Sequence, residues 1–146
     1  MEKIKIFFIF LFLFLLDFLK PLGYSLYVHF LLLGILFFSS KFSPFSLCIG
    51  LLFSFFEDIL SFSFPFYTLL FSLISLGIRY FLNYFTLKSV SKFFVVGFSI
   101  TFYILVHIFM GKGNISFNSY SIFFLHSFLF FFLLDKFISE WIQKVS

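Results

Sequence analysis

Six long apolar stretches, separated only by short polar breaks, are the feature that most constrains the fold of this chain. A membrane-spanning helix needs about 20 mostly apolar residues, and about 17 suffice when flanking side chains reach the interface. The stretches cover residues 4–19, 22–38, 42–60, 64–85, 93–110 and 120–138. The pattern therefore predicts a bundle of about six transmembrane helices. The first two spans are short, so a tilted, partial or re-entrant helix is expected among them.

The composition favours the same fold class. Of the 146 residues, 62% are hydrophobic and 11% are charged, whereas a soluble domain carries about 25% charged residues. So few charges cannot cover a water-exposed surface. Neither a linker nor an internal sequence repeat is visible, so residues 1–146 are expected to form a single polytopic transmembrane domain, an all-α integral membrane protein.

Several function classes are excluded by what the sequence lacks. Cys48 is the one cysteine, which excludes an intramolecular disulfide and a Cys-rich zinc module. No Gly-rich phosphate loop, HExxH or GxSxG motif occurs. The basic residues lie mostly singly between apolar runs, unlike a nucleic-acid-binding patch. We therefore expect no catalytic residue, no cofactor and no nucleic-acid partner.

The lysines and arginines near the ends of the stretches predict the orientation, because positive charge collects on the cytoplasmic side. With six spans and the N-terminus inside, only Lys20 and Lys112 lie on the outer face. The cytoplasmic set is Lys3, Lys5, Lys41, Arg79, Lys88, Lys92, Lys136 and Lys144. Both termini are therefore expected in the cytoplasm, and the first stretch is expected to be an uncleaved anchor because no small-residue cleavage site follows it.

The third stretch carries a face of small residues that ends in an acid. Gly50, Ser54 and Asp58 recur every fourth residue, which places them on one face of a helix. Small residues at this spacing let a neighbouring helix approach closely. We expect a helix-packing or partner-docking seam here.

Asp58 is also placed to hold the next helix. Ser61, Ser63 and Pro65 follow it, and serine near the N-cap with proline in the first turn is typical of a helix start. A carboxylate there would face the positive end of the helix dipole. A structural latch between the third and fourth helices is favoured, and a contact to a partner subunit is the alternative.

The fourth stretch carries a polar stripe. Thr68, Ser72, Ser75 and Arg79 lie within about 60° of one another on a helix. We expect the hydroxyls to pack against another helix and Arg79 to extend towards the cytoplasmic side.

The three histidines are candidate metal ligands. His29, His107 and His126 all fall within about 10 Å of the outer surface, near Asp58. No HxH or HxxxH pair pre-organises two of them, so contacts between helices are the favoured interpretation. Glu57 and Asp58 point about 100° apart on a helix and do not form an acid–base pair.

The stretch from Gly50 to Gly77, GLLFSFFEDILSFSFPFYTLLFSLISLG, combines these features in a characteristic order. It resembles the family of the rod-shape-determining protein MreD. Gly50, the Asp-Ile-Leu-Ser element 58–61 and the Pro-Phe pair 65–66 match that family's pattern. The chain departs from it at Ser54, Phe62 and Ser63, where glycines are frequent, and in lacking a proline in the last span.

The resemblance implies a non-enzymatic scaffold of the bacterial cell-elongation machinery in the inner membrane. Its implied partners are an MreC-like membrane protein, the MreB filament and the peptidoglycan synthase complex. It also implies a fold similar to the six-helix substrate-binding subunits of energy-coupling-factor transporters. The residues expected to carry helix packing or partner contact are Gly50, Ser54, Asp58, Ser61 and Pro65.

Two other readings remain. One is the substrate-binding membrane subunit of a vitamin or metal importer, for which the outer loop 111–119, with Asn114 and Asn118, and the histidines offer polar groups. The other is a small membrane subunit with no site of its own.

Overall fold

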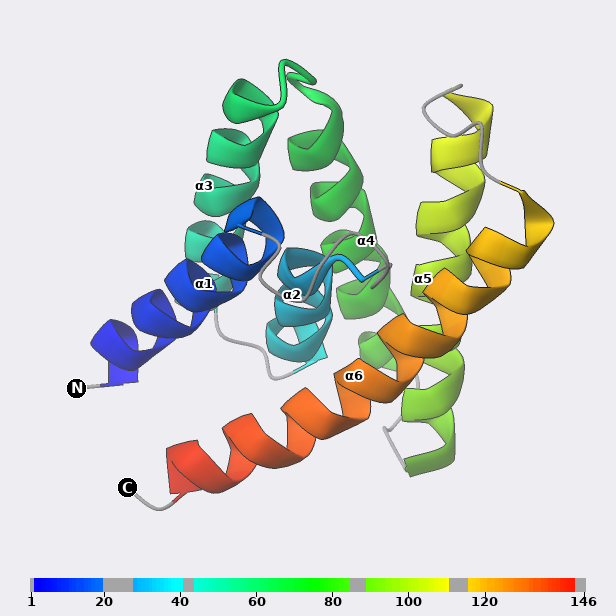
Figure 1. Cartoon of the computed structure of the whole chain (residues 1–146). Coiled ribbons are helices and arrows are strands. Elements are labelled where there is room, and N and C mark those ends of the chain that lie inside the picture. The colour runs from blue at the N-terminus through cyan, green and yellow to red at the C-terminus, as the bar shows by residue number, and fades with distance from the viewer. Residues whose placement is uncertain (1, 20–27, 41–43, 85–88, 111–115, 144–146) are drawn as a thin grey trace.

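In the computed structural model the described residues are all-helical, which confirms the all-α part of the predicted fold class. The structure describes residues 2–19, 28–40, 44–84, 89–110 and 116–143, and these form helices and no strand. The helices are α1 (Glu2–Leu19), α2 (Phe30–Ser40), α3 (Pro44–Leu60), α4 (Phe66–Tyr84), α5 (Ser89–Phe109) and α6 (Phe117–Gln143), shown in Figure 1.

Helices α1 and α3 run parallel to each other. Near the start of both helices, the Lys3 ammonium lies 5.5 Å from the ring centre of Phe45. Further along, Phe10 packs against Gly50. Helices α5 and α6 instead form an antiparallel pair, in which Tyr103 stacks on Phe123 with ring centres 5.5 Å apart.

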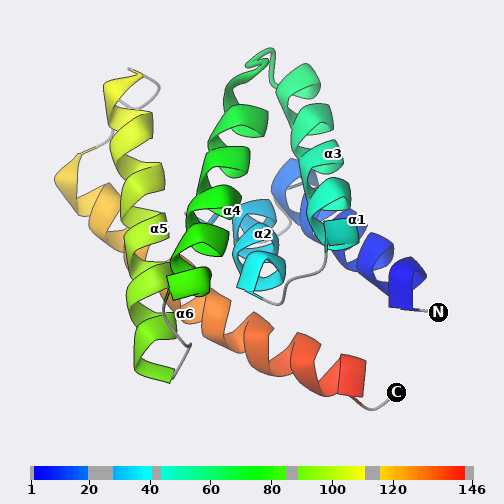
Figure 2. The ribbon, with the colours of Figure 1, turned by 180° about the vertical axis from the view of Figure 1, so that it is seen from behind.

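Helix α6 crosses beneath the other helices and returns towards α1 (Figures 1 and 2). The Lys5 ammonium, near the start of α1, lies 5.6 Å from the ring centre of Trp141, near the end of α6. The beginning of the first helix and the end of the last therefore lie on the same side of the molecule.

Helix α2 is the centre of the fold. Every residue from Phe30 to Ser39 is buried, and the helix packs against α1, α3, α4 and α6. The reason is its sequence, FLLLGILFFSS, which is apolar on all sides and has no face suited to water. Phe30 meets Phe130 of α6 with ring centres 5.6 Å apart.

The expectation of a helix over residues 22–38 is wrong at its start. Helix α2 begins at Phe30, Val28 and His29 are not helical, and residues 20–27 lie outside the described part. Its 11 residues extend about 16 Å, against about 30 Å for the hydrocarbon core of a bilayer. Of the alternatives foreseen for a short span, a partial helix is the one found.

Two other expected breaks are partly helical. Helix α5 already begins at Ser89, so Lys92 lies inside it, and α6 begins at Phe117, within the expected loop 111–119. Polar residues next to an apolar run continue a helix readily when nothing breaks the backbone. The expected breaks at Lys20-Pro21 and Lys41, together with Lys88, Lys112 and Lys144, lie outside the described residues.

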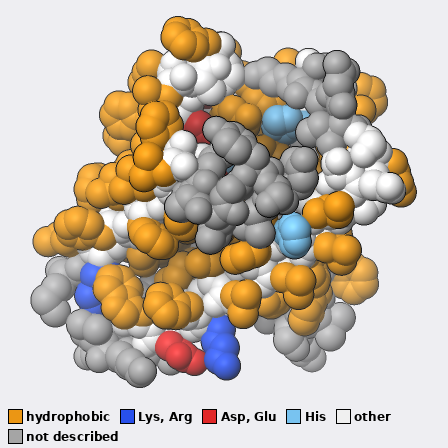
Figure 3. Space-filling view, in the orientation of Figure 1, with side chains coloured by type: hydrophobic (Ala, Val, Ile, Leu, Met, Phe, Trp, Pro, Cys, Tyr) orange, Lys and Arg blue, Asp and Glu red, His pale blue; other side chains and the backbone are white. Residues whose placement is uncertain are grey.

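The outer surface is apolar. Within the described ranges, two helices are long and apolar enough to cross a membrane, over Lys92–Phe109 and Phe117–Trp141. Both leave large side chains uncovered: Phe98 is 75% exposed and Phe137 is 70% exposed, whereas a core helix of a soluble protein hides such groups. Figure 3 shows hydrophobic side chains over most of one face of the molecule. These features associate the chain with a membrane, although by length and composition they support two spans rather than six.

Candidate functional site

Asp58 closes the hairpin between α3 and α4. Its side chain is fully buried, and its two oxygens accept hydrogen bonds from the amides of Tyr67 and Thr68, both at 2.8 Å. The hydroxyls of Thr68 and Ser63 donate to it as well, at 2.6 and 3.0 Å. An N-cap side chain satisfies the second and third amides of a helix in this way. Asp58 thus has the geometry expected of a latch, supplied from the preceding helix.

The turn between these helices differs in detail from the expected one. Ser61 is exposed and donates to the carbonyl of Glu57 at 2.7 Å, so it does not cap α4. Pro65 lies just before the first helical residue, and its carbonyl accepts the amide of Leu69 at 3.0 Å. At the tip, Phe62 has a φ of 52° and is 98% exposed.

The seam on α3 faces the chain's own helices. Gly50, Ser54 and Asp58 are all buried. A Cβ placed on Gly50 would lie 3.0 Å from the Phe10 ring of α1 and 3.1 Å from Ile35 of α2, so glycine is what allows the three helices to approach. The Ser54 hydroxyl donates to the Gly50 carbonyl at 2.8 Å and so needs no partner outside the helix.

Asp17 is a second cap that sequence reasoning missed. One of its oxygens accepts the Phe30 amide at 2.8 Å and the other accepts the Leu31 amide at 2.7 Å. Asp17 and Asp58 each stand two residues before the end of their helix and each cap the helix that follows. The signal in the sequence was an acid near the end of an apolar stretch, a position that Asp17 shares with Asp58.

His29 links the end of α1 to the end of α3. Its Nδ1 lies 3.2 Å from an oxygen of Asp17 on α1, and its Nε2 lies 3.0 Å from an oxygen of Glu57 on α3. The three side chains retain only 11%, 10% and 18% exposure for His29, Asp17 and Glu57. The ends of α1 and α3 and the start of α2 therefore meet at one largely buried cluster of titratable groups.

Aromatic rings surround His29. Its ring centre lies 5.3 Å from those of Tyr67 and Phe71 and 5.7 Å from that of Tyr103. His107 of α5 packs on Tyr103 at 4.6 Å and on Tyr67 at 5.9 Å. The cluster is thus walled on this side by α4 and α5.

The three histidines do not come together in one group of potential metal ligands, which agrees with the favoured interpretation of separate histidines. Among the described residues, the three potential metal ligands that lie within 4.8 Å of one another are Asp17, His29 and Glu57. His107 shares two tyrosine neighbours with His29 but lies outside this group, and His126 is on α6, where its Nδ1 is buried without a hydrogen-bond partner. The sequence indicates how deep each histidine lies along its helix. It does not indicate the direction of each side chain around the helix, and this direction determines whether the three side chains meet.

The hydroxyl stripe of α4 is bonded mostly within its own helix. Ser72 donates to the Thr68 carbonyl at 2.7 Å and Ser75 donates to the Ser72 carbonyl at 2.9 Å. Only the Thr68 hydroxyl crosses to another helix, where it meets Asp58. The expectation of hydroxyl contacts between helices is therefore correct for Thr68 and wrong for these two serines.

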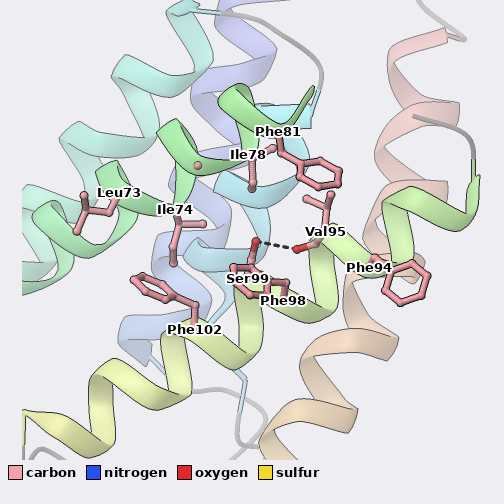
Figure 4. A pocket seen from close by; sticks show the side chains of 10 residues that line it. Leu73, Ile74, Ile78, Phe81, Phe94, Val95, Phe98, Ser99 and Phe102 are labelled. Atoms are coloured by element: carbon pink, nitrogen blue, oxygen red, sulfur yellow. Dashed lines mark hydrogen bonds between the residues drawn. The ribbon is translucent and has the colours of Figure 1, made fainter. Parts of the chain in front are cut away.

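A groove separates α4 from α5. It has a volume of about 380 Å³ and almost entirely apolar walls, formed by residues such as Ile74, Ile78, Phe98 and Phe102 (Figure 4). Its serine, Ser99, donates to the Val95 carbonyl of its own helix at 2.8 Å. A second, smaller cavity between α1 and α6 is also lined by apolar residues. Neither offers the converging polar groups that fix a small polar ligand.

Beyond this cluster, an ion pair joins the last two helices. Lys92 of α5 lies 2.6 Å from a carboxylate oxygen of Asp135 on α6. Most charged side chains in Figure 3 lie along the lower edge, on the side where α1 begins and α6 ends.

Fold and site together define a small, all-helical, membrane-associated protein whose buried polar groups hold helix ends. Comparison of the chain with protein-family models, with curated proteins and with solved structures finds no match.

Proposed function

We propose that this protein is a non-enzymatic membrane scaffold of the bacterial cell-elongation machinery, similar to MreD. One observation carries the proposal: the stretch from Gly50 to Gly77, on which the resemblance rests, folds into the α3–α4 hairpin closed by Asp58. The residues that define the resemblance serve the shape of the hairpin rather than a reaction. This suits a scaffold, because the residues that distinguish a scaffold are expected to maintain its shape.

The apolar cavities support a scaffold over a carrier. A protein that captures a polar solute needs donors and acceptors directed into a pocket, whereas the walls between α4 and α5 and between α1 and α6 are almost wholly apolar. Surfaces of this kind suit lipid or the apolar helix of another membrane protein. The proposed partners are an MreC-like protein in the same bilayer and, through it, the MreB filament and the peptidoglycan synthase complex.

The proposed location is the inner membrane, with six crossings and both ends in the cytoplasm. The nearness of Lys5 on α1 to Trp141 on α6 supports a common side for the two ends. The second crossing would include the short helix α2, whose residues Phe30 to Ser39 are enclosed by the other helices.

Affinity purification of the tagged chain in mild detergent tests the proposal. We expect a coiled-coil MreC-like protein to co-elute and to be identified by mass spectrometry. Gly50→Leu should abolish co-elution by disrupting the packing of α3 against α1 and α2, whereas Gly77→Leu is the matched control, because nothing lies within 4 Å of a Cβ at Gly77. Co-elution of an ATPase pair, without an MreC-like chain, would refute the scaffold.

The second candidate is the membrane subunit of a metal importer. The cluster of Asp17, His29 and Glu57 favours it, because nitrogen and carboxylate ligands meet there. Metal uptake by cells that express the chain together with the ATPase pair distinguishes the two candidates, since a scaffold leaves uptake unchanged.

A further inference from the structure

Three metal-ligating side chains meet where α1, α2 and α3 come together. Asp17 is on α1, His29 directly precedes α2 and Glu57 is on α3, and one ligand atom from each lies within 4.8 Å of the others. These positions are 12 to 40 residues apart in the chain. The fold, rather than a local motif, brings them together.

Hydrogen bonding leaves part of this cluster unsatisfied. The Glu57 Oε2 atom is buried and accepts no hydrogen bond, and the His29 Nε2 atom is buried and makes none, although it lies 3.0 Å from Glu57 Oε1. Buried polar atoms are nearly always paired, so such atoms call for an explanation.

The charge of the cluster is also unbalanced. Among the described residues, neither Asp17 nor Glu57 forms an ion pair with a lysine or an arginine. A protonated His29 would balance one of the two carboxylates and leave the other uncompensated. Uncompensated charge that is largely removed from water is costly, and such carboxylates are normally paired or coordinate a metal.

We propose that Asp17, His29 and Glu57 bind one divalent transition-metal ion of the Zn²⁺ or Mn²⁺ class. One imidazole and two carboxylates are a ligand set that such ions accept. The Nδ1 atom of His29 lies 3.2 Å from Asp17 and its Nε2 atom lies 3.0 Å from Glu57, so a single ion would take one of these nitrogens and draw the more distant carboxylate towards it. The amides of Phe30 and Leu31 orient Asp17, as outer-shell groups orient metal ligands.

The ion would join three helices. α2 is too short to anchor itself across a bilayer, and its start would be fastened to α1 through Asp17 and to α3 through Glu57. The site rests on this geometry alone, so it stands whether or not the chain is a scaffold.

Metal titration of the full chain tests the site. The protein is purified in mild detergent with a chelator and a histidine-free tag, and ZnCl₂ or MnCl₂ is then added. We expect one ion per chain by equilibrium dialysis and elemental analysis, together with a higher melting temperature. Absence of binding at micromolar metal would overturn the proposal, and the cluster would then be a histidine-bridged carboxylate pair.

Substitutions locate the ion. Glu57→Gln and His29→Gln should each weaken binding by at least about tenfold, whereas the controls Glu140→Gln on α6, where the side chain is exposed, and His126→Gln should bind as the parent does. Equal binding by parent and site variants would show an adventitious ion only.

X-ray absorption spectroscopy of the loaded parent protein does not depend on the folding of any variant. A first shell of nitrogen and oxygen with one imidazole is expected. A shell without imidazole, or with several, would contradict the assignment.

Discussion

Gly50 and Gly77 form a matched pair of helix glycines with opposite surroundings. A Cβ on Gly50 would stand 3.0 Å from two atoms of the Phe10 ring and 3.1 Å from Ile35. Phe10 is fully buried and packs against Phe38, so its ring has no room to retreat. A Cβ on Gly77 would meet nothing within 4 Å. Alanine variants at the two positions therefore separate the effect of packing on stability from the effect of helix propensity.

The expected magnitudes follow from these contacts. Replacing a helix glycine by alanine contributes about 0.5–1 kcal/mol in favour of the helix at either site. Overpacking a tight core costs about 1–3 kcal/mol, and this cost applies to Gly50 alone. We expect Gly50→Ala to lower the free energy of unfolding by about 1 kcal/mol and Gly77→Ala to raise it by about 0.5–1 kcal/mol.

Unfolding by sodium dodecyl sulfate from a mild detergent measures the difference. Helix content by circular dichroism and the fluorescence of Trp141, the one tryptophan, should report the same transition. Gly50→Leu should go further and leave little folded protein, since the larger side chain has no space between α1 and α2.

Equal changes in the free energy of unfolding for Gly50→Ala and Gly77→Ala, in the same direction, would refute the assignment of a packing cost to Gly50. That result would mean that α1, α2 and α3 are packed more loosely around Gly50 than the structure has them. A stabilised Gly50→Ala protein would contradict it most directly.

The remaining predictions concern the cap, the ion pair and the orientation. Asp58→Asn should lower the free energy of unfolding by about 2–4 kcal/mol, because an amide nitrogen replaces an oxygen that accepts hydrogen bonds from α4; Glu140→Gln is the control, and equal unfolding curves would refute the latch. For Lys92 and Asp135, which are about a quarter exposed, a double-mutant cycle should give a coupling energy of about 0.5–1 kcal/mol; zero coupling would mean that solvent screens the pair. Reporter fusions to the two termini should both be active in the cytoplasm, and opposite locations would exclude an even number of crossings.

The helices and the Asp58 cap were open to prediction because their causes are local. Long apolar runs make helices at membrane depth whatever surrounds them. Asp58 lies within ten residues of Thr68, whose amide and hydroxyl it accepts, and a short turn leaves the carboxylate few other donors. Its role could therefore be read from spacing alone.

The His29 cluster and the shortness of α2 could not be predicted, because their causes are distant in the sequence. Glu57 reaches His29 only because α1 and α3 run parallel, and nothing near Glu57 in the chain specifies that packing. An apolar run such as 22–38 gives no sign of where its helix begins. The start at Phe30 depends on Asp17, 13 residues earlier.

The enclosure of α2 has a consequence for how the protein is made. One of its walls is α6, the last described helix in chain order, and Phe130 of α6 packs on Phe30. During synthesis α2 therefore lacks this wall until α6 has been made. A chain cut short before α6 would leave its innermost helix partly uncovered.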